Sequence, residues 1–222
     1  MNAHTVRRMI TGIILLLLLG IPLSQQSFEI PSLEEVIKPS AQLESSSDEL
    51  DKLQVKGRAP KTGYARSEFG NGWSNDLGCD TRNRILARDL TNIQVDAECK
   101  VQSGVLQDPY TGVRILFTRG ETTSDDVQID HVVALSNAWQ TGAQGLTYAE
   151  RVQLANDPLN LLAVDGAANE QKSDGDAATW LPSNKSFRCE YVRRQISVKQ
   201  KYRLWVTSAE RDAMIRILTS CK

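Results

Sequence analysis

The sequence predicts an α+β domain built on two strands and a following helix, a ββα core with further helices around it. Runs rich in β-branched and apolar residues at 113–119, 127–133 and 159–164 have the length and composition of strands. The segments between and after them carry capping boxes and apolar residues at helical spacing. With 222 residues, 41% hydrophobic and 24% charged, the chain is long enough for one globular domain with appendages.

The first predicted segment, residues 1–24, has the pattern of an export signal. Arg7 and Arg8 precede an apolar run at 13–19 that continues to Leu23. This stretch is shorter than the roughly 20 residues of a membrane-spanning helix, and it lacks a clear small-residue cleavage site. A cleaved signal peptide and an uncleaved N-terminal anchor therefore both stay open. In either case we expect a secreted or externally tethered domain without stable membrane insertion of its own.

The second predicted segment, residues 25–57, reads as a flexible acidic linker, because it is rich in Ser and carries seven acidic against three basic side chains. The third, residues 58–222, is the expected domain. Its 21 basic and 20 acidic side chains nearly cancel. The overall charge therefore gives no argument for a nucleic-acid partner, and any basic surface must come from the distribution of arginines on the fold.

The elements of the domain are expected in a definite order. A helix over 81–90 carries Ile85, Leu86 and Leu90 on one face. A turn at 108–112 leads into the strand at 113–119. The strand at 127–133 should pair with 159–164, with a short helix between them opened by the capping box at 147–150. Helices over 166–178, from Phe187 to Trp205, and after a capping box at 207–210 complete the domain.

The four cysteines, which all follow the signal, suit an oxidising compartment. They do not show the paired C-x-x-C spacing of a zinc site, and three disulfide pairings are possible. We favour Cys79–Cys99, which would staple a small N-terminal lobe, and Cys189–Cys221, because each closes a local loop. Each bridge should add about 3 kcal/mol of stability. Four free buried thiols are the alternative.

The adjacent residues Asp130 and His131 are the strongest indication of chemistry. The sequence has two histidines, and the other, His4, precedes the export signal's apolar run. His131 is therefore the candidate for proton transfer in the exported domain. Asn160 and Asn169 follow it. An acid, a histidine and two amides in this order suit metal-assisted phosphodiester cleavage, whereas the plainer alternative is a structural histidine with turn and cap asparagines.

The order of motifs resembles a known enzyme family. Strand, insertion, strand and helix, with Asp-His on the first strand, resemble the ββα-metal motif of the HNH, or His-Me finger, endonucleases. More closely, the motifs look like those of secreted HNH proteins related to the C-terminal domain of the GmrSD restriction endonucleases. The resemblance spans roughly 63–221 and is carried by the runs DHVVAL at 130–135, ANDPLNL at 155–161, NEQK at 169–172, WLP at 180–182 and CEY at 189–191.

The resemblance implies a role for each residue. His131 would be the general base that takes a proton from the attacking water. Asp130 and Asn169 would hold one divalent cation on the scissile phosphate. Asn160 would hydrogen-bond across the two strands and hold the His131 segment in place. For binding of further phosphates, Lys172, Arg82 and Arg114 are candidates.

The cofactor expected from these ligands is one hard divalent cation. Carboxylate and amide oxygens suit Mg²⁺, with Mn²⁺ as the alternative, and no zinc site is expected because zinc prefers Cys and His ligands. Asn169 stands where the family name implies a histidine. Asp130 and His131 would point to opposite faces of a regular strand, so the strand must bend or end there if both serve one site.

The function expected is that of a secreted, metal-dependent endonuclease hydrolysing phosphodiester bonds in DNA, with RNA as a further substrate. Two alternatives stay open: a catalytically silent, disulfide-stapled binding module, and a metal-dependent hydrolase of another phosphodiester polymer such as teichoic acid. The expected partner is the nucleic acid substrate. The sequence identifies no protein partner.

Overall fold

The structure is a computed structural model that describes residues 48–76, 78–120 and 123–221. The predicted signal or anchor at 1–24 and the linker up to residue 47 lie outside the described residues. Within the described ranges, no helix is both long and apolar enough to cross a membrane.

Helices and strands are mixed along the described chain, which confirms the α+β class. The strands are β1 (Asn75–Asp76), β2 (Cys79–Asp80), β3 (Leu90–Val95), β4 (Val101–Gln107), β5 (Arg114–Thr118), β6 (Val127–His131) and β7 (Leu161–Asp165). The helices are α3 (Thr81–Asp89), α4 (Leu135–Gln140), α5 (Tyr148–Asn156), α6 (Gly166–Lys172), α7 (Arg188–Lys201) and α8 (Ser208–Ser220). Three short 3-10 turns are η2 (Arg66–Phe69), η3 (Ala143–Gly145) and η4 (Lys185–Phe187).

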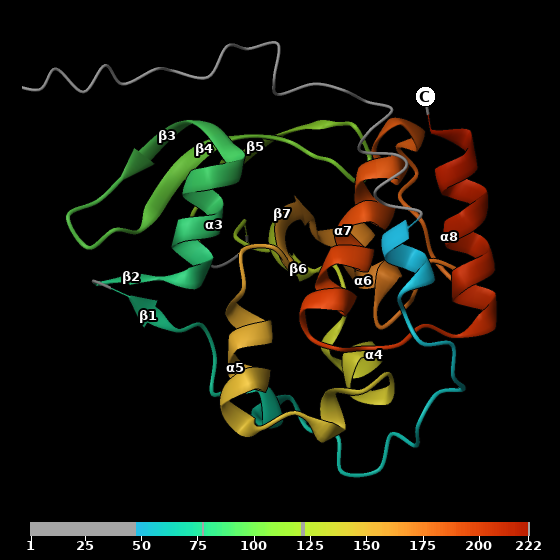
Figure 1. The fold of residues 1–222 in the computed structure, drawn as a ribbon. Coiled ribbons are helices and arrows are strands. Elements are labelled where there is room, and N and C mark those ends of the chain that lie inside the picture. The colour runs from blue at the N-terminus through green and yellow to red at the C-terminus, as the bar shows by residue number, and fades with distance from the viewer. Residues whose placement is uncertain (1–47, 77, 121–122, 222) are drawn as a thin grey trace, which may run out of the picture. The chain divides into compact units, whose positions relative to one another are not determined.

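The antiparallel pair of strands β6 and β7 and the helix α6 lie at the centre of the described fold (Figure 1). The two strands pair antiparallel, with Asp130 opposite Leu162 and His131 opposite Leu161. This is the pairing expected for the segments 127–133 and 159–164. Helix α6 starts at Gly166, directly after β7 ends at Asp165. A second, antiparallel sheet has the order β3-β4-β5 and lies to one side with α3.

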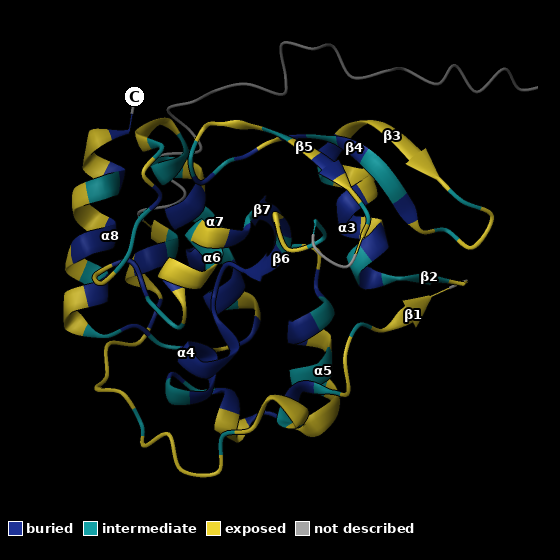
Figure 2. Cartoon of the chain, turned by 180° about the vertical axis from the view of Figure 1, so that it is seen from behind, coloured by how far each residue is buried: buried dark blue, intermediate teal, exposed yellow. Residues whose placement is uncertain are grey.

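The β6–β7 strand pair is buried on both faces. Leu162 and Val164 pack in one core cluster with Tyr191, Ile196 and Met214 of α7 and α8. Alternate residues face a second cluster shared with α3 and the three-stranded sheet, among them Ile129, Leu161 and Ala163. Figure 2 shows these central elements as buried and the outer edge of β3 as exposed. Each buried aliphatic side chain contributes about 1.5 to 3 kcal/mol to the stability of the fold, so this packing holds the β6–β7 strand pair in place.

Local sequence signals explain where the helices begin. Both expected capping boxes are confirmed: Thr147 with Glu150 opens α5, and Thr207 with Glu210 opens α8. At the start of α6 a glycine is required, since a Cβ on Gly166 would lie 2.0 Å from the Asp125 carbonyl oxygen. That close approach packs the β7–α6 turn against the loop before β6.

Some elements differ from the expectation. The helix expected over 166–178 ends at Lys172, because Ser173 has a φ of 49° and cannot continue a right-handed helix. The long C-terminal helix begins at Arg188 and ends at Lys201. Strands β3 and β4 and helix α4 were not predicted from the sequence.

The described fold begins before residue 58, where the domain was expected to start. Residues 48–51 are helical, and Leu50 and Leu53 are 1% and 8% exposed in the same core cluster as α7 and α8. Val55 forms a parallel bridge with Val206. Composition indicated a solvated linker, but two leucines in the acidic stretch fill part of the core, so the folded unit includes residues 48–57.

Both favoured disulfides are confirmed. Cys79–Cys99 joins β2 to the connection between β3 and β4, and Cys189–Cys221 joins the start of α7 to the residue after α8. The described residues contain no free cysteine.

Candidate functional site

Two cavities meet at His131. The polar cavity has a volume of about 560 Å³, and its polar lining residues are Lys61, Tyr64, Arg66, Gln128, Asp130, His131, Ser136, Asn169, Glu170, Ser173 and Asp174. The aromatic cavity has a volume of about 420 Å³ and is lined by Arg66, Phe69, Trp73, His131 and the Gly70–Gly72 loop, with Leu135 and Ala155. Asp130, His131 and Asn169, which are separate in the sequence, thus share the wall of the polar cavity.

His131 is the last residue of β6, and its ring is held from two sides. Its Nε2 lies 2.9 Å from the Ala155 carbonyl oxygen, which can only accept a hydrogen bond, so Nε2 must carry the hydrogen. In the neutral ring Nδ1 is then left as an acceptor. The Trp73 ring stacks on the imidazole, with centroids 5.6 Å apart and planes 15° apart. These contacts fix both the tautomer and the plane of the ring.

The electrostatic environment keeps His131 neutral. Burial lowers the pKa of the imidazole from 6.5 to about 3; the hydrogen bond to Ala155 opposes this shift, and the positive charges of Arg66 and Lys172 favour it. The ring is therefore unprotonated at neutral pH and offers a lone pair on Nδ1. The pKa is low for a base working at pH 7, and an approaching phosphate anion would raise it.

Asp130 is 5% exposed and is held by two buried donors. Lys172 Nζ lies 2.9 Å from Asp130 Oδ1 and also 2.9 Å from the His131 carbonyl oxygen, and the Tyr110 hydroxyl donates to Asp130 Oδ2. Burial raises the pKa of Asp130, whereas the charge of Lys172 and both hydrogen bonds favour the carboxylate. The carboxylate is thereby fixed in one orientation at the wall of the polar cavity.

Asn169 projects from α6 toward the neighbouring strand. Its Nδ2 donates to Gln128 Oε1 at 2.7 Å, and Gln128 lies on β6 two residues before Asp130. Within the described residues, no donor is bonded to the Asn169 amide oxygen. Gln128 thus orients the side-chain amide of Asn169.

Asn160 is fully buried and bonds to the segment that follows His131. Its Oδ1 accepts from the Val133 amide at 2.8 Å, and its Nδ2 donates to the Val133 and Leu154 carbonyls at 3.3 and 3.4 Å. The Val132 amide donates to the Asn160 carbonyl at 2.8 Å. One side chain therefore ties the chain after His131 to the segments around 154 and 160. These contacts extend the β6–β7 pairing beyond its regular end.

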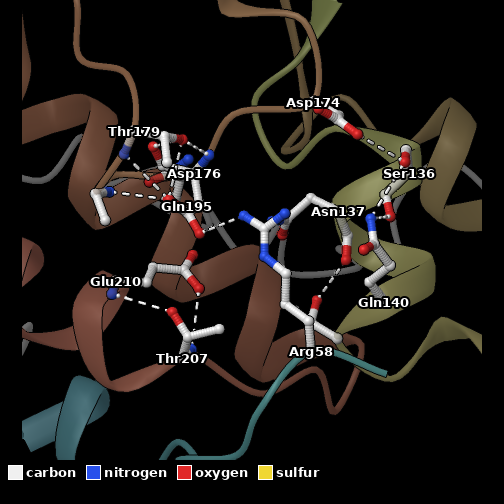
Figure 3. A network of polar contacts seen from close by, with 12 residues as sticks. Arg58, Ser136, Asn137, Gln140, Asp174, Asp176, Thr179, Gln195, Thr207 and Glu210 are labelled. Carbon is white, nitrogen blue, oxygen red and sulfur yellow. Dashed lines mark hydrogen bonds and ion pairs between the residues drawn. The ribbon is translucent and has the colours of Figure 1, made fainter. Parts of the chain in front are cut away.

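A network of polar contacts holds the loop that follows α6 (Figure 3). Arg58 extends from the N-terminal segment and forms a 2.7 Å ion pair with the buried Asp176. The Ser136 hydroxyl donates to Asp174 at 3.0 Å, which links α4 to the loop after α6. Asp174, which lines the polar cavity just after α6, and Asp176 are therefore held by ion pairs and hydrogen bonds rather than by regular structure.

None of the three expected phosphate ligands lines either of these cavities. The Lys172 side chain is fully buried and bonded to Asp130. Arg82 donates to the carbonyls of Ser124 and Val127, where it holds the start of β6. Arg114 is exposed on β5 and lines neither cavity. The structure thus brings together Asp130, His131 and Asn169 but not these three cations.

Sequence reasoning missed two residues beside His131, namely Arg66 and Trp73. Both lie before the motifs that carry the family resemblance, and no local sequence pattern indicates that they belong to the site. They reach His131 because η2 packs against α5, which brings residues 66–73 beside the end of β6. Only this tertiary packing identifies them.

The oxygen ligands at the polar cavity fit the chemistry of a hard cation. The described residues contain no group of three His, Cys, Asp or Glu side chains placed to hold a metal ion. Each Asp130 oxygen makes one hydrogen bond and keeps a further lone pair, and the Asn169 oxygen is the second candidate ligand. A site with one carboxylate and one amide suits Mg²⁺, which keeps several waters and accepts substrate phosphate oxygens.

The chain is similar to known proteins in two of three comparisons. A family model described as "GmrSD restriction endonucleases, C-terminal domain" matches residues 80–217. An "Uncharacterized secreted protein" of Arthroderma benhamiae is 42% identical over 175 residues, which cover 78% of this chain and 82% of that protein. No solved structure matches the chain.

Proposed function

Because the chain belongs to the family of the C-terminal domain of GmrSD restriction endonucleases, we propose that it is an exported, metal-dependent HNH endonuclease that hydrolyses phosphodiester bonds in DNA. One observation carries the proposal: His131, Asp130 and Asn169 line a single polar cavity, with His131 held as a neutral acceptor. The β6–β7–α6 arrangement that presents them supports a ββα-metal core.

His131 is the general base of the proposed mechanism. Its Nε2–H group donates a hydrogen bond to the Ala155 carbonyl, so Nδ1 accepts the proton of the attacking water. Trp73 keeps the ring plane fixed during this transfer. Asn160 holds the chain after His131 and acts as a positioning residue that does not touch the substrate.

Asp130 and Asn169 are the proposed ligands of one divalent cation, Mg²⁺ or Mn²⁺. When bound, such a cation polarises the scissile phosphate and stabilises the leaving oxygen. Lys172 neutralises part of the charge of Asp130 and fixes its orientation, while Gln128 orients the amide of Asn169. The side chains of Asp130 and Asn169 are thus already oriented without a bound cation.

Export is supported by two observations. Both disulfides are formed, which suits an oxidising compartment. The fungal relative is described as a secreted protein. We therefore propose that the enzyme acts outside the cell, on DNA that it meets there.

The experiment uses the full-length chain, purified from an exporting host, with supercoiled plasmid as substrate. We expect nicking and linearisation in Mg²⁺ or Mn²⁺, loss of cleavage in EDTA and recovery on adding Mg²⁺. His131→Ala should abolish cleavage with little change in melting temperature. Cleavage that persists in EDTA or in His131→Ala would refute the mechanism, and DNA binding without cleavage would favour a silent binding module.

A further inference from the structure

Arg66 lies where the polar and aromatic cavities meet. Three residues line both cavities: Arg66, His131 and Leu135. Of these, Arg66 has the side chain that carries a permanent positive charge. A ligand that passes from one cavity to the other must therefore pass this guanidinium beside the proposed base.

Arg66 is exposed, and within the described residues it has no hydrogen-bond or ion-pair partner. Most other arginines of the described residues already have a partner. Seven form ion pairs, namely Arg58, Arg84, Arg88, Arg151, Arg194, Arg203 and Arg211. Three donate to backbone or amide oxygens, namely Arg82, Arg119 and Arg188. Arg66 keeps all five of its donors for a ligand, and a guanidinium in this state matches the oxygens of a phosphate.

The backbone that carries Arg66 is firmly anchored. Arg151 of α5 donates to the Glu68 carbonyl at 2.8 Å and forms a 2.9 Å ion pair with its carboxylate. Phe69, next along the turn, is buried against Trp139 and Tyr64. The turn η2 thus holds the base of the Arg66 side chain beside His131, which reduces the ordering cost of binding.

The two cavities differ in chemistry. The polar cavity is lined mostly by charged and hydrogen-bonding side chains, while the aromatic cavity carries Phe69, Trp73 and a glycine-containing loop. A polymer that alternates phosphates with flat, apolar bases suits such a pair of cavities, because phosphates need cationic donors and bases need aromatic or apolar surface.

We propose that Arg66 binds a phosphate of the nucleic acid strand beside His131, and that residues 66–73 form the second wall of the substrate cleft. The strand crosses from the polar cavity into the aromatic cavity at this arginine. This inference rests on the proposed nuclease function, and it adds a substrate ligand that lies before residue 80, where the match to the family begins.

The test measures binding of a fluorescent duplex oligonucleotide to the full-length chain in EDTA, where the strand stays intact. Arg66→Ala should raise the Kd about ten-fold or more, because it removes a charge-assisted phosphate contact. The slope of log Kd against log salt should fall by about 0.9, the value of one phosphate contact on duplex DNA. Arg66→Lys should recover part of the affinity, since it keeps the charge without the bidentate fork.

Arg216→Ala is the matched control, because Arg216 is an exposed arginine on α8 that lines neither cavity. It removes the same charge and should leave the Kd nearly unchanged. Equal effects of Arg66→Ala and Arg216→Ala, or an unchanged salt slope in Arg66→Ala, would overturn the assignment. Melting temperatures check that the variants fold, and Arg66→Gln provides a second neutral variant.

The two proposals fail in different ways. If the wild type cleaves DNA, His131→Ala does not, and Arg66→Ala binds like the wild type, then the nuclease function stands and the Arg66 assignment is wrong. If His131→Ala still cleaves while Arg66→Ala binds weakly, the assignment of Arg66 stands and the proposed base is wrong. A wild type that neither binds nor cleaves DNA overturns both.

Discussion

Replacing Lys199 by methionine should destabilise the protein strongly. Lys199 and Glu210 form an ion pair between α7 and α8 in which both side chains are fully buried, with Nζ 2.9 Å from Oε1. Lys199 Nζ also donates to the Trp205 carbonyl at 2.9 Å and lies 3.3 Å from Asn137 Oδ1. Methionine has a similar length but no charge, so Lys199→Met leaves the Glu210 carboxylate buried without its partner.

The magnitude follows from that unpaired charge. Removing one partner of a buried ion pair costs about 3 to 5 kcal/mol in the free energy of unfolding. For a domain of this size, that corresponds to a fall in melting temperature of about 6 to 20 °C. The double variant Lys199→Met/Glu210→Gln should recover much of the loss, because glutamine is neutral and can still close the capping box with Thr207.

The loss should also depend on pH. Burial raises the pKa of Glu210, and Lys199 opposes that shift, so Lys199→Met raises the pKa further. Between the unfolded pKa of about 4.3 and the raised folded pKa, the folded state binds more protons than the unfolded state. The stability of Lys199→Met therefore falls as pH rises through this window, and its deficit against wild type is larger at pH 7 than at pH 4.

Urea unfolding at pH 4 and pH 7, followed by circular dichroism, measures both effects. Lys100→Met is the control, because Lys100 forms an exposed ion pair with Glu98 and such pairs contribute about 0 to 1 kcal/mol. A loss for Lys199→Met no larger than that for Lys100→Met, or a deficit that does not change with pH, would refute the reasoning about the buried pair.

Three further variants or treatments test the site and the scaffold. Asn160→Ala should lower the free energy of unfolding by about 1 to 3 kcal/mol and also reduce cleavage, since it leaves the buried Val133 amide unbonded; a fully active, fully stable variant would remove its positioning role. Asn169→Ala should raise the Mg²⁺ concentration needed for half-maximal cleavage, and an unchanged metal titration would count against its role as a ligand. Mutating Cys189 and Cys221 together to serine should lower stability by about 3 to 4 kcal/mol, the loop-closure value, as measured by thermal melting; no loss would contradict it.

The parts of the fold that the sequence predicted depend on local signals. Capping boxes at Thr147 and Thr207 fix two helix starts through hydrogen bonds within four residues. Strands β6 and β7 are buried on both faces, so their apolar runs are visible. Strands β3 and β4 were missed because β3 is mostly exposed, its pairing with β4 has register shifts, and Gly104 interrupts β4.

The candidate site, like the fold, could be predicted only in part from the sequence. That Asp130, His131 and Asn169 share one cavity could be predicted, because the paired strands β6 and β7 and the helix that follows them were expected from the sequence. The partners of Asp130 show the limit, because Tyr110 comes from the loop before β5 and Lys172 is buried rather than exposed. A lysine one turn after Asn169 has the same sequence pattern whether it faces solvent or an internal carboxylate, so only packing decides its role.

The packing of Leu50 and Leu53 against α7 and α8 limits where a protease can cut the chain without disturbing the core. A protease that cuts upstream of Asp48 releases a product that retains both leucines. A cut after Leu53 removes both and opens a gap among Tyr191, Val192 and Met214. We therefore expect limited proteolysis of the folded protein to yield a stable fragment whose first residue precedes Leu50.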